Sequence, residues 1–153
     1  MQKRYQTSVF LFHRDLRLHD NSGLLEALKN SESVIPLFIF EKKQIDQENA
    51  YRSPFAVRFL CESLLDLTSE LNKQGGSLLV RYGDTEQELQ NVFLQYSVNA
   101  FYCNADYTPF ARARDAAIET LCQKTNVAYE QHHDALLCPP GSVLKKDQQP
   151  YKI

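Results

Sequence analysis

The feature that most constrains this fold is a regular alternation between short apolar runs and longer amphipathic segments. Five apolar runs rich in strand-forming residues predict strands at residues 8–12, 34–40, 78–82, 98–103 and 127–130. The four segments between them carry apolar residues at helical spacing and predict helices. Strands that alternate with helices through short connections favour a parallel sheet. We therefore predict an α/β protein with a Rossmann-like, doubly wound, five-stranded parallel sheet and helices on both faces.

Capping residues set the expected starts of the helices. Ser53-Pro54 and Thr108-Pro109 each place a hydroxyl side chain before a proline, which is typical of a helix start. Asp20-Asn21-Ser22 supplies capping residues for the first helix, and Thr85-Glu86-Gln87-Glu88 predicts a capping box for the third. Pro36 interrupts the second apolar run, so we expect one side of that strand to be bulged or unpaired. The second helix is expected to bury one apolar face, made of Phe59, Leu60, Leu64, Leu67 and Leu71.

Composition excludes several classes of protein. The chain has 153 residues, of which 43% are hydrophobic and 24% charged, so it is long enough to bury a core and is neither disordered nor fibrous. A net charge of −2 argues against a free-standing nucleic-acid binder. The apolar run after the basic N-terminus is short and is broken by His13-Arg14-Asp15. We therefore expect neither a signal peptide nor a membrane span, and a cytoplasmic location.

No residue pattern in the chain predicts a metal site or a catalytic centre. The cysteines are far apart and form no C-x-x-C pair, so we expect small buried hydrophobic side chains in a reducing compartment at Cys61, Cys103, Cys122 and Cys138. His132 and His133 are adjacent at a strand end, where successive side chains point in opposite directions and do not readily share one ion. No Ser, Cys or carboxylate pair stands in a recognisable nucleophile or acid–base arrangement.

The loop after the first strand, residues 13–21, holds the most informative polar residues. Ligands of open α/β sheets bind beyond the carboxyl ends of the strands, where this loop is expected to lie. The loop contains no glycine, which disfavours the NAD-binding fingerprint and the phosphate-binding loop of ATP hydrolases. Its arginines can pair with its own aspartates or hold the carboxylate or phosphate of a ligand. The loop is therefore either a polar cap that ties itself to the sheet or a ligand contact.

Residues 12–21 closely resemble the opening signature of the DNA photolyase and cryptochrome family, an aromatic residue followed by x-R-D-L-R-L-x-D-N. Further similarities follow in the family's order, at the strand 34–40, at Ser53-Pro54 with Arg58-Phe59-Leu60, at Gly83-Asp84, at residues 104–115, and in the tail at Pro139-Pro140-Gly141-Ser142-Val143 and Pro150-Tyr151-Lys152-Ile153. The resemblance covers essentially the whole chain.

This resemblance implies an N-terminal antenna domain over residues 1–133, similar to that of deoxyribodipyrimidine photolyases. Residues 134–153 would begin the connection to a C-terminal helical domain that carries FAD, the DNA-binding face and the electron-transfer tryptophans. The chain itself contains no Trp. The implied function is to collect light for the repair of pyrimidine dimers in DNA, which this part alone would not catalyse. The implied partner is the FAD domain, with DNA reached only through it, and the apolar tail also raises self-association.

The resemblance also bears on the antenna chromophore. Folate-binding members have a histidine just before the Ser-Pro helix and an Asn-Glu pair near the start of the fourth helix. Here Ala50 and Phe110-Ala111 stand at those places, which disfavours methenyltetrahydrofolate because a pterin ring would lose polar partners. Residues 104–115 look closer to members that bind a deazaflavin or another flavin. An empty pocket is the third alternative.

The candidate chromophore contacts come from the loops at the carboxyl ends of the strands, and are Phe12, His13, Arg14, Asp15, Phe40, Asp106, Tyr107, Arg112 and Arg114. Asp106 is expected to accept a hydrogen bond from an isoalloxazine-like edge, and Phe40 and Tyr107 to offer apolar faces. Two alternatives stay open. Asp106 can instead cap the fourth helix beside solvated arginines, and the chain can be a stand-alone Rossmann-like nucleotide- or flavin-binding module without repair activity.

Overall fold

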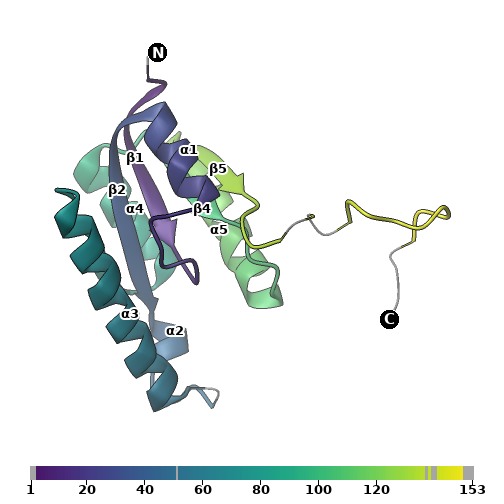
Figure 1. Ribbon diagram of the computed structural model, residues 1–153, viewed down its shortest axis with the longest axis horizontal. Helices are drawn as coiled ribbons and strands as arrows, with labels where there is room; N and C mark the ends of the chain where they lie inside the picture. Colours follow the sequence, from purple (N-terminus) through teal and green to yellow (C-terminus); the bar gives the residue numbers. More distant parts are fainter. Residues whose placement is uncertain (1–2, 51, 137, 139–140, 150–153) are drawn as a thin grey trace.

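Five strands form one parallel sheet in the computed structural model, which describes residues 3–50, 52–136, 138 and 141–149 (Figure 1). The strands are β1 (Tyr5–Phe12), β2 (Ser31–Glu41), β3 (Leu79–Gly83), β4 (Ala100–Asn104) and β5 (Ala128–His132). Their order across the sheet is β3-β2-β1-β4-β5, and every pairing is parallel. The order reverses between β1 and β4, as it does in doubly wound Rossmann-like sheets. The predicted fold class is confirmed.

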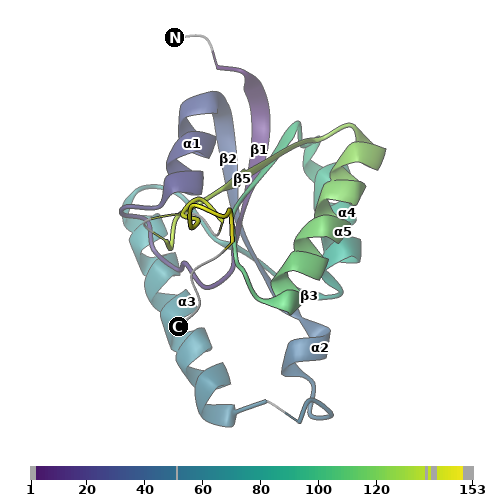
Figure 2. The same cartoon turned by 90° about the vertical axis from the view of Figure 1, so that its right-hand side faces the viewer.

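Helices cover both faces of the sheet. They are α1 (Ser22–Asn30), α2 (Lys42–Ile45), α3 (Pro54–Lys73), α4 (Thr85–Tyr96) and α5 (Pro109–Thr125). Figure 2 shows α1 and α3 on one side of the strands and α4 and α5 on the other. The sequence did not predict α2, because four residues in a polar stretch are too few to show a helical period. This helix follows the carboxyl end of β2 directly and lies beside the candidate site.

Most of the expected helix starts are confirmed. Asn21, Ser53 and Thr108 are the N-caps of α1, α3 and α5, and each side chain accepts a backbone N–H of the first turn. The predicted capping box at Thr85 is wrong. Asp84 is the N-cap of α4, because its carboxylate already accepts the N–H groups of the first turn. The Thr85 hydroxyl lies within the helix and donates to Glu41 Oε2 at 2.5 Å.

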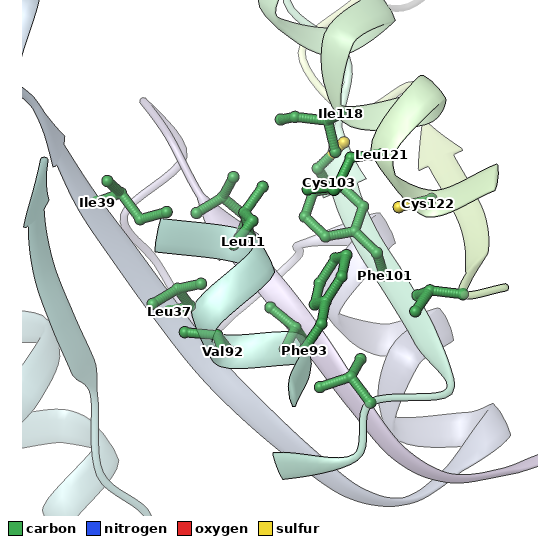
Figure 3. Packing of buried hydrophobic residues seen from close by; sticks show 14 residues of the cluster. Leu11, Leu37, Ile39, Val92, Phe93, Phe101, Cys103, Ile118, Leu121 and Cys122 are labelled. Carbon is green, nitrogen blue, oxygen red and sulfur yellow. The ribbon is translucent and has the colours of Figure 1, made fainter. Parts of the chain in front are cut away.

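Apolar side chains fill both spaces between sheet and helices. Figure 3 shows the cluster on the α4 and α5 side, where Cys103 and Cys122 pack among leucine, valine and phenylalanine side chains. Burial at these two positions matches the prediction. It is wrong for Cys61 and Cys138, which are exposed. Cys61 falls on the outward side of α3, and Cys138 lies in the segment after β5, so neither position faces the sheet.

The predicted apolar face of α3 is buried only along its second half. Leu64, Leu67 and Leu71 pack against the sheet, whereas Phe59 is 72% exposed and Phe55 is 84% exposed. The N-terminal half of α3 projects past the carboxyl ends of the strands (Figure 2). Helical periodicity identifies a face but does not tell how far the sheet beneath it extends. The aromatic side chains of this half are therefore available to line a cavity.

Pro36 marks the place where β2 loses one of its neighbours. Phe10 of β1 pairs with Pro36, while the pairing with β3 begins only at Leu37. The expectation of one unpaired side is confirmed, because a residue without a backbone N–H is tolerated where a ladder bond is not required.

Residues 141–149 lie apart from the sheet (Figure 1), and apolar side chains after β5 are exposed at Leu136, Val143 and Leu144. The division at 133/134 stays a prediction. Residues 137, 139–140 and 150–153, which include parts of the tail that carry the family resemblance, lie outside the described residues. Within the described part of the chain, none of the helices combines the length and apolar character needed to cross a bilayer.

Candidate functional site

A buried amide fills the crevice where the strand order reverses. Asn104 ends β4, and its Nδ2 donates to Asp15 Oδ2 at 2.6 Å and to Asn21 Oδ1 at 2.8 Å. Its Oδ1 accepts the backbone N–H of Gly23 at 3.0 Å. The protein's own side chains thus occupy the place where a doubly wound sheet often binds its ligand. This arrangement joins β1, α1 and β4 into one unit.

Gly23 is required by the closeness of this packing. A Cβ atom built at Gly23 would lie 2.6 Å from Asn104 Oδ1 and 2.9 Å from the Phe10 ring. Both distances are shorter than van der Waals contact, and neither neighbour is a mobile chain end. The absence of a side chain at Gly23 therefore lets α1 approach β4 closely enough for the hydrogen bond to Asn104.

A second contact ties the loop to the segment after β5. Arg17 Nη2 lies 2.5 Å from Asp134 Oδ2, and Asp134 Oδ1 accepts the Ser22 N–H at 2.9 Å. Partial burial acts to raise the pKa of Asp134, but the Ser22 N–H and the Arg17 guanidinium outweigh it and lower that pKa. Around Asp15 and Arg17, the geometry matches the polar-cap alternative.

The largest hollow at this end of the molecule is a cavity of about 730 Å³ beyond β1 and β2, between α3 and the start of α5. Its walls are mostly apolar, from Leu11, Phe12, Leu16, Phe38, Ile39, Ala56, Phe59, Leu60 and Phe110. The polar side chains on its wall come from His13, Arg14, Glu41, Gln44, Ser63, Thr85, Asp106, Thr108 and Arg114. A mostly apolar hollow with a few polar groups is the usual form of a site for a ring-shaped organic ligand.

Asp106 and Arg14 form an ion pair on the cavity wall. Arg14 Nη1 lies 3.3 Å from Asp106 Oδ2, with the arginine side chain 77% exposed and the aspartate 19% exposed. Asp106 Oδ1 also accepts the Thr108 N–H at 3.2 Å. Although partial burial opposes them, these two contacts lower the pKa of Asp106, so this side chain is a carboxylate at neutral pH. It borders the N-cap of α5 and the cavity at once.

Arg114, also on the cavity wall, is held rigidly by its neighbours. Its Nε and Nη2 donate to Asp115 Oδ1 at 2.9 and 2.8 Å, and Gln131 Nε2 donates to Asp115 Oδ2 at 2.8 Å. Burial raises the pKa of Asp115, although the Arg114 guanidinium opposes that shift. The side chain of Arg114 is only 14% exposed. The guanidinium therefore presents a fixed positive charge to the cavity.

His13 stands between this cavity and a smaller hollow of about 270 Å³, because it lines both. Burial, assisted by the Arg114 guanidinium and opposed by Asp106, lowers the pKa of His13 to about 3. The imidazole is therefore neutral at physiological pH. Its backbone N–H donates to Asp15 Oδ1 at 2.9 Å, which fixes the start of the loop.

Two of the predicted chromophore contacts line only the smaller hollow. Asp15 and Tyr107 line it together with Arg17, Asn104 and Asp134. The Tyr107 ring stacks on His133 at a centroid distance of 5.9 Å, and the two side chains share a hydrogen bond of 2.7 Å. The neighbouring His132 stacks on Tyr102 instead. The Tyr107 ring therefore packs against His133.

The structure separates the nine candidate residues into three groups. Five of them surround the large cavity, namely Phe12, His13, Arg14, Asp106 and Arg114. Asp15 and Tyr107 line only the smaller hollow, which His13, Arg14 and Asp106 also border. Phe40 packs edge-on against Phe38 at 5.0 Å and is on neither wall, and Arg112 lies on the exposed side of α5.

Sequence reasoning missed much of the cavity wall. The residues it did not single out as contacts include Phe38, Glu41, Ala56, Phe59, Ser63, Thr85 and Phe110. Of those on α3, only Phe59 was considered, and it was assigned to the buried apolar face of the helix. The one usable signal was position, since Ser53-Pro54 starts a helix directly after the loop that leaves β2.

The fold and this cavity define a Rossmann-like α/β domain with a ligand-sized, mostly apolar hollow beyond the carboxyl ends of β1 and β2. The family model described as DNA photolyase matches residues 8–153. The chain therefore belongs to the DNA photolyase family, and its fold is that of the family's N-terminal α/β domain.

Two solved photolyase structures are similar to the chain over nearly all of its length. One is the archaeal photolyase of Sulfolobus tokodaii, described with two FAD molecules and an implied novel light-harvesting cofactor. It is 40% identical, has a TM-score of 0.85, and the match covers 92% of this chain and 32% of that one. The other is a class III photolyase of Agrobacterium tumefaciens, which is 28% identical with a TM-score of 0.85. That match covers 100% of this chain and 31% of that one.

Curated relatives include a Cryptochrome-1 of Aedes aegypti, which is 33% identical over 144 residues. That match covers 90% of this chain and 26% of the relative. The first curated relatives are all longer, since the chain spans between 26% and 52% of their lengths. Family membership is thus established for this domain, whereas the activity of a whole photolyase resides in proteins of greater length.

Proposed function

We propose that this chain is the light-harvesting domain of a photolyase-type protein and holds a flavin or deazaflavin ring system in the 730 Å³ cavity. The observation that carries the proposal is the cavity itself, whose aromatic and aliphatic walls bear a few polar groups beyond β1 and β2. The relative with 40% identity supports it, because that protein is described with two FAD molecules and a novel light-harvesting cofactor. A similar protein is therefore described with more than one flavin.

The chemistry of the walls favours a flat, largely apolar chromophore over a folate. Phe110 lines the cavity at the place where folate-binding relatives resemble one another in an Asn-Glu pair. An apolar ring there gives a pterin no hydrogen-bond partner, and a buried donor without an acceptor is costly. The same ring is a suitable neighbour for an isoalloxazine or deazaflavin face.

The proposal extends to the protein in which this domain works. Its partner would be a C-terminal domain that carries FAD, and DNA would be bound only through that domain. The light-harvesting domain would absorb near-ultraviolet or blue light and pass the excitation to that FAD for light-driven repair of pyrimidine dimers. Relatives named deoxyribodipyrimidine photo-lyase, of which this chain spans about 30%, support this division of labour.

A titration of the purified chain with candidate chromophores tests the proposal. Riboflavin, FMN, FAD, 5-deazariboflavin, methenyltetrahydrofolate and ATP would be added in turn, with absorption and fluorescence recorded. We expect saturable binding, with a shifted or quenched band, for the flavins and the deazaflavin. Saturable binding of ATP without a response to any chromophore would contradict the proposal and favour a stand-alone nucleotide-binding module.

Two tryptophan substitutions on one helix locate the ligand. Ser63 lines the cavity, whereas Ser69 lies two turns further along α3 on an exposed position outside the cavity wall. Ser63→Trp fills part of the cavity and is expected to reduce flavin affinity at least tenfold. Ser69→Trp is the matched control and is expected to leave affinity within twofold of the parent. Equal affinity in both variants would place the ligand elsewhere.

A further inference from the structure

One nitrogen atom at the site lacks the hydrogen bond that its burial calls for. Among the described residues, four buried side-chain atoms find no hydrogen-bond partner, and His13 Nε2 is the one that belongs to a residue of the large cavity wall. Buried polar atoms are nearly always paired, so an exception at a cavity calls for an explanation. A bound ligand would supply the missing partner of His13 Nε2.

The surroundings of His13 sharpen the contrast. Three charged groups of the wall already have partners within the protein, since Arg14 pairs with Asp106, Arg114 with Asp115, and Glu41 with Thr85. His13 is held by its backbone, through the bond from its N–H to Asp15. Its ring lines the cavity, and turning Nε2 toward the hollow breaks no side-chain hydrogen bond of that nitrogen. His13 Nε2 is therefore a polar atom at the cavity that a ligand can pair without displacing a hydrogen bond of the protein.

The charge state of the ring defines what it can recognise. Because the pKa of His13 is lowered to about 3, the imidazole is neutral and does not attract a phosphate or carboxylate as a cation would. A neutral imidazole nitrogen either accepts from an N–H or donates to a carbonyl, depending on its tautomer. A ring edge that carries an N–H between two carbonyl groups satisfies either form.

We propose that His13 Nε2 hydrogen-bonds the pyrimidinedione edge of the bound chromophore, at N3 and its flanking carbonyls, and so selects that edge. This inference rests on the proposed function, because it assumes that a flavin or deazaflavin occupies the cavity. Flavins and 5-deazaflavins share this edge, so His13 accepts both classes. The remaining walls bind the ring by apolar contact, and His13 fixes the orientation of the ring in the cavity.

The test compares riboflavin with N3-methylriboflavin, in which a methyl group blocks this edge. For the parent chain, the affinity for the methylated ligand is expected to be five- to tenfold lower, the value of one hydrogen bond to a neutral group. In His13→Leu the difference is expected to fall below twofold. In His13→Gln, whose amide can donate and accept from a similar position, the difference is expected to return.

Stability separates this role from a structural one. Removing a buried nitrogen that has no partner does not cost stability, so the urea midpoint of ligand-free His13→Leu is expected to match or exceed that of the parent. A lower midpoint would show that the ring already has a partner and would overturn the inference. The same ratio of the two affinities in the parent and in His13→Leu would also overturn it. Failure of riboflavin to bind the parent would instead refute the proposed function, and with it this inference.

Discussion

The first residues of the loop between β1 and α1 differ from those that follow in whether their polar groups have partners within the protein. From Asp15 onward, the side chains of Asp15, Arg17 and Asn21 are bonded to partners in β4, α1 and the segment after β5. At the end nearest β1, His13 lines a 730 Å³ cavity with a buried nitrogen that lacks a partner among the described residues. Neighbouring residues of one signature thus differ: some are bonded within the protein, while His13 is the residue to which we assign ligand recognition. Similarity in the signature therefore identifies the family but not the ligand.

The largest effect on stability is expected from a negative charge placed on β4 beside Asp15. Asn104→Asp sets two carboxylates at the 2.6 Å separation that now joins Asn104 Nδ2 and Asp15 Oδ2. The variant is expected to lose about 3 kcal/mol of unfolding free energy at pH 7. The repulsion raises the folded-state pKa of the pair above the unfolded value of about 3.9, so the loss is complete at neutral pH and shrinks as pH falls toward 4. Urea unfolding at several pH values measures it.

The control for that charge is Asn99→Asp. Asn99 is exposed, and its Oδ1 accepts the Thr7 N–H, which a carboxylate does equally well. We expect a change below about 0.5 kcal/mol. A similar loss in both variants would mean that the effect is not specific to the crevice.

A smaller loss is expected from Gly23→Ala. Its new methyl group meets Asn104 Oδ1 and the Phe10 ring at 2.6 and 2.9 Å, and overpacking of this kind costs about 2 kcal/mol. Gly76→Ala is the matched change, since a Cβ there lies 3.6 Å from Leu71 in ordinary contact. The difference between the two urea midpoints measures the closeness of α1 to β4. Equal midpoints would contradict the account of the crevice.

Asp134→Asn tests the outer tie of the loop, with an expected loss of about 1 kcal/mol at pH 7 because Arg17 is 44% exposed. The folded-state pKa of Asp134 is lowered, so its contribution is present above the unfolded pKa of about 3.9 and is lost as pH falls through the folded value. The gap between parent and variant should therefore close under acid conditions. Asp66→Asn on the exposed side of α3 is the control, and a gap that stays constant with pH would contradict the ion pair.

The smallest effect on stability is expected from Arg14→Ala. The Arg14 side chain is 77% exposed, and exposed ion pairs contribute between zero and about 1 kcal/mol. Thermal unfolding of the ligand-free chain should change little. A loss as large as that of Asp134→Asn would remove the contrast between the two ends of the loop.

Much of the fold was predictable because its causes are local. Alternating apolar runs and the caps at Asn21, Ser53 and Thr108 fix the elements and their order. The site was harder, because the cavity wall depends on how far α3 extends beyond the sheet. Phe59 has the helical spacing of a core residue and yet is exposed, on the half of α3 that projects past the strands. Phe38 and Phe40 lie two residues apart on β2 and so share one face of the strand, yet only Phe38 lines the cavity, because the neighbouring helices decide which of them reaches it.

The bond between Asn104 and Asp15 spans 89 residues of sequence, and this separation orders the events of folding. During synthesis β1, α1 and β2 emerge well before residue 104, so the N–H of Gly23 has no access to its partner during that interval. Contacts between distant residues also slow folding, since a long stretch of chain must be ordered first. The signature loop therefore cannot complete its hydrogen bonds to Asn104 until β4 has been made.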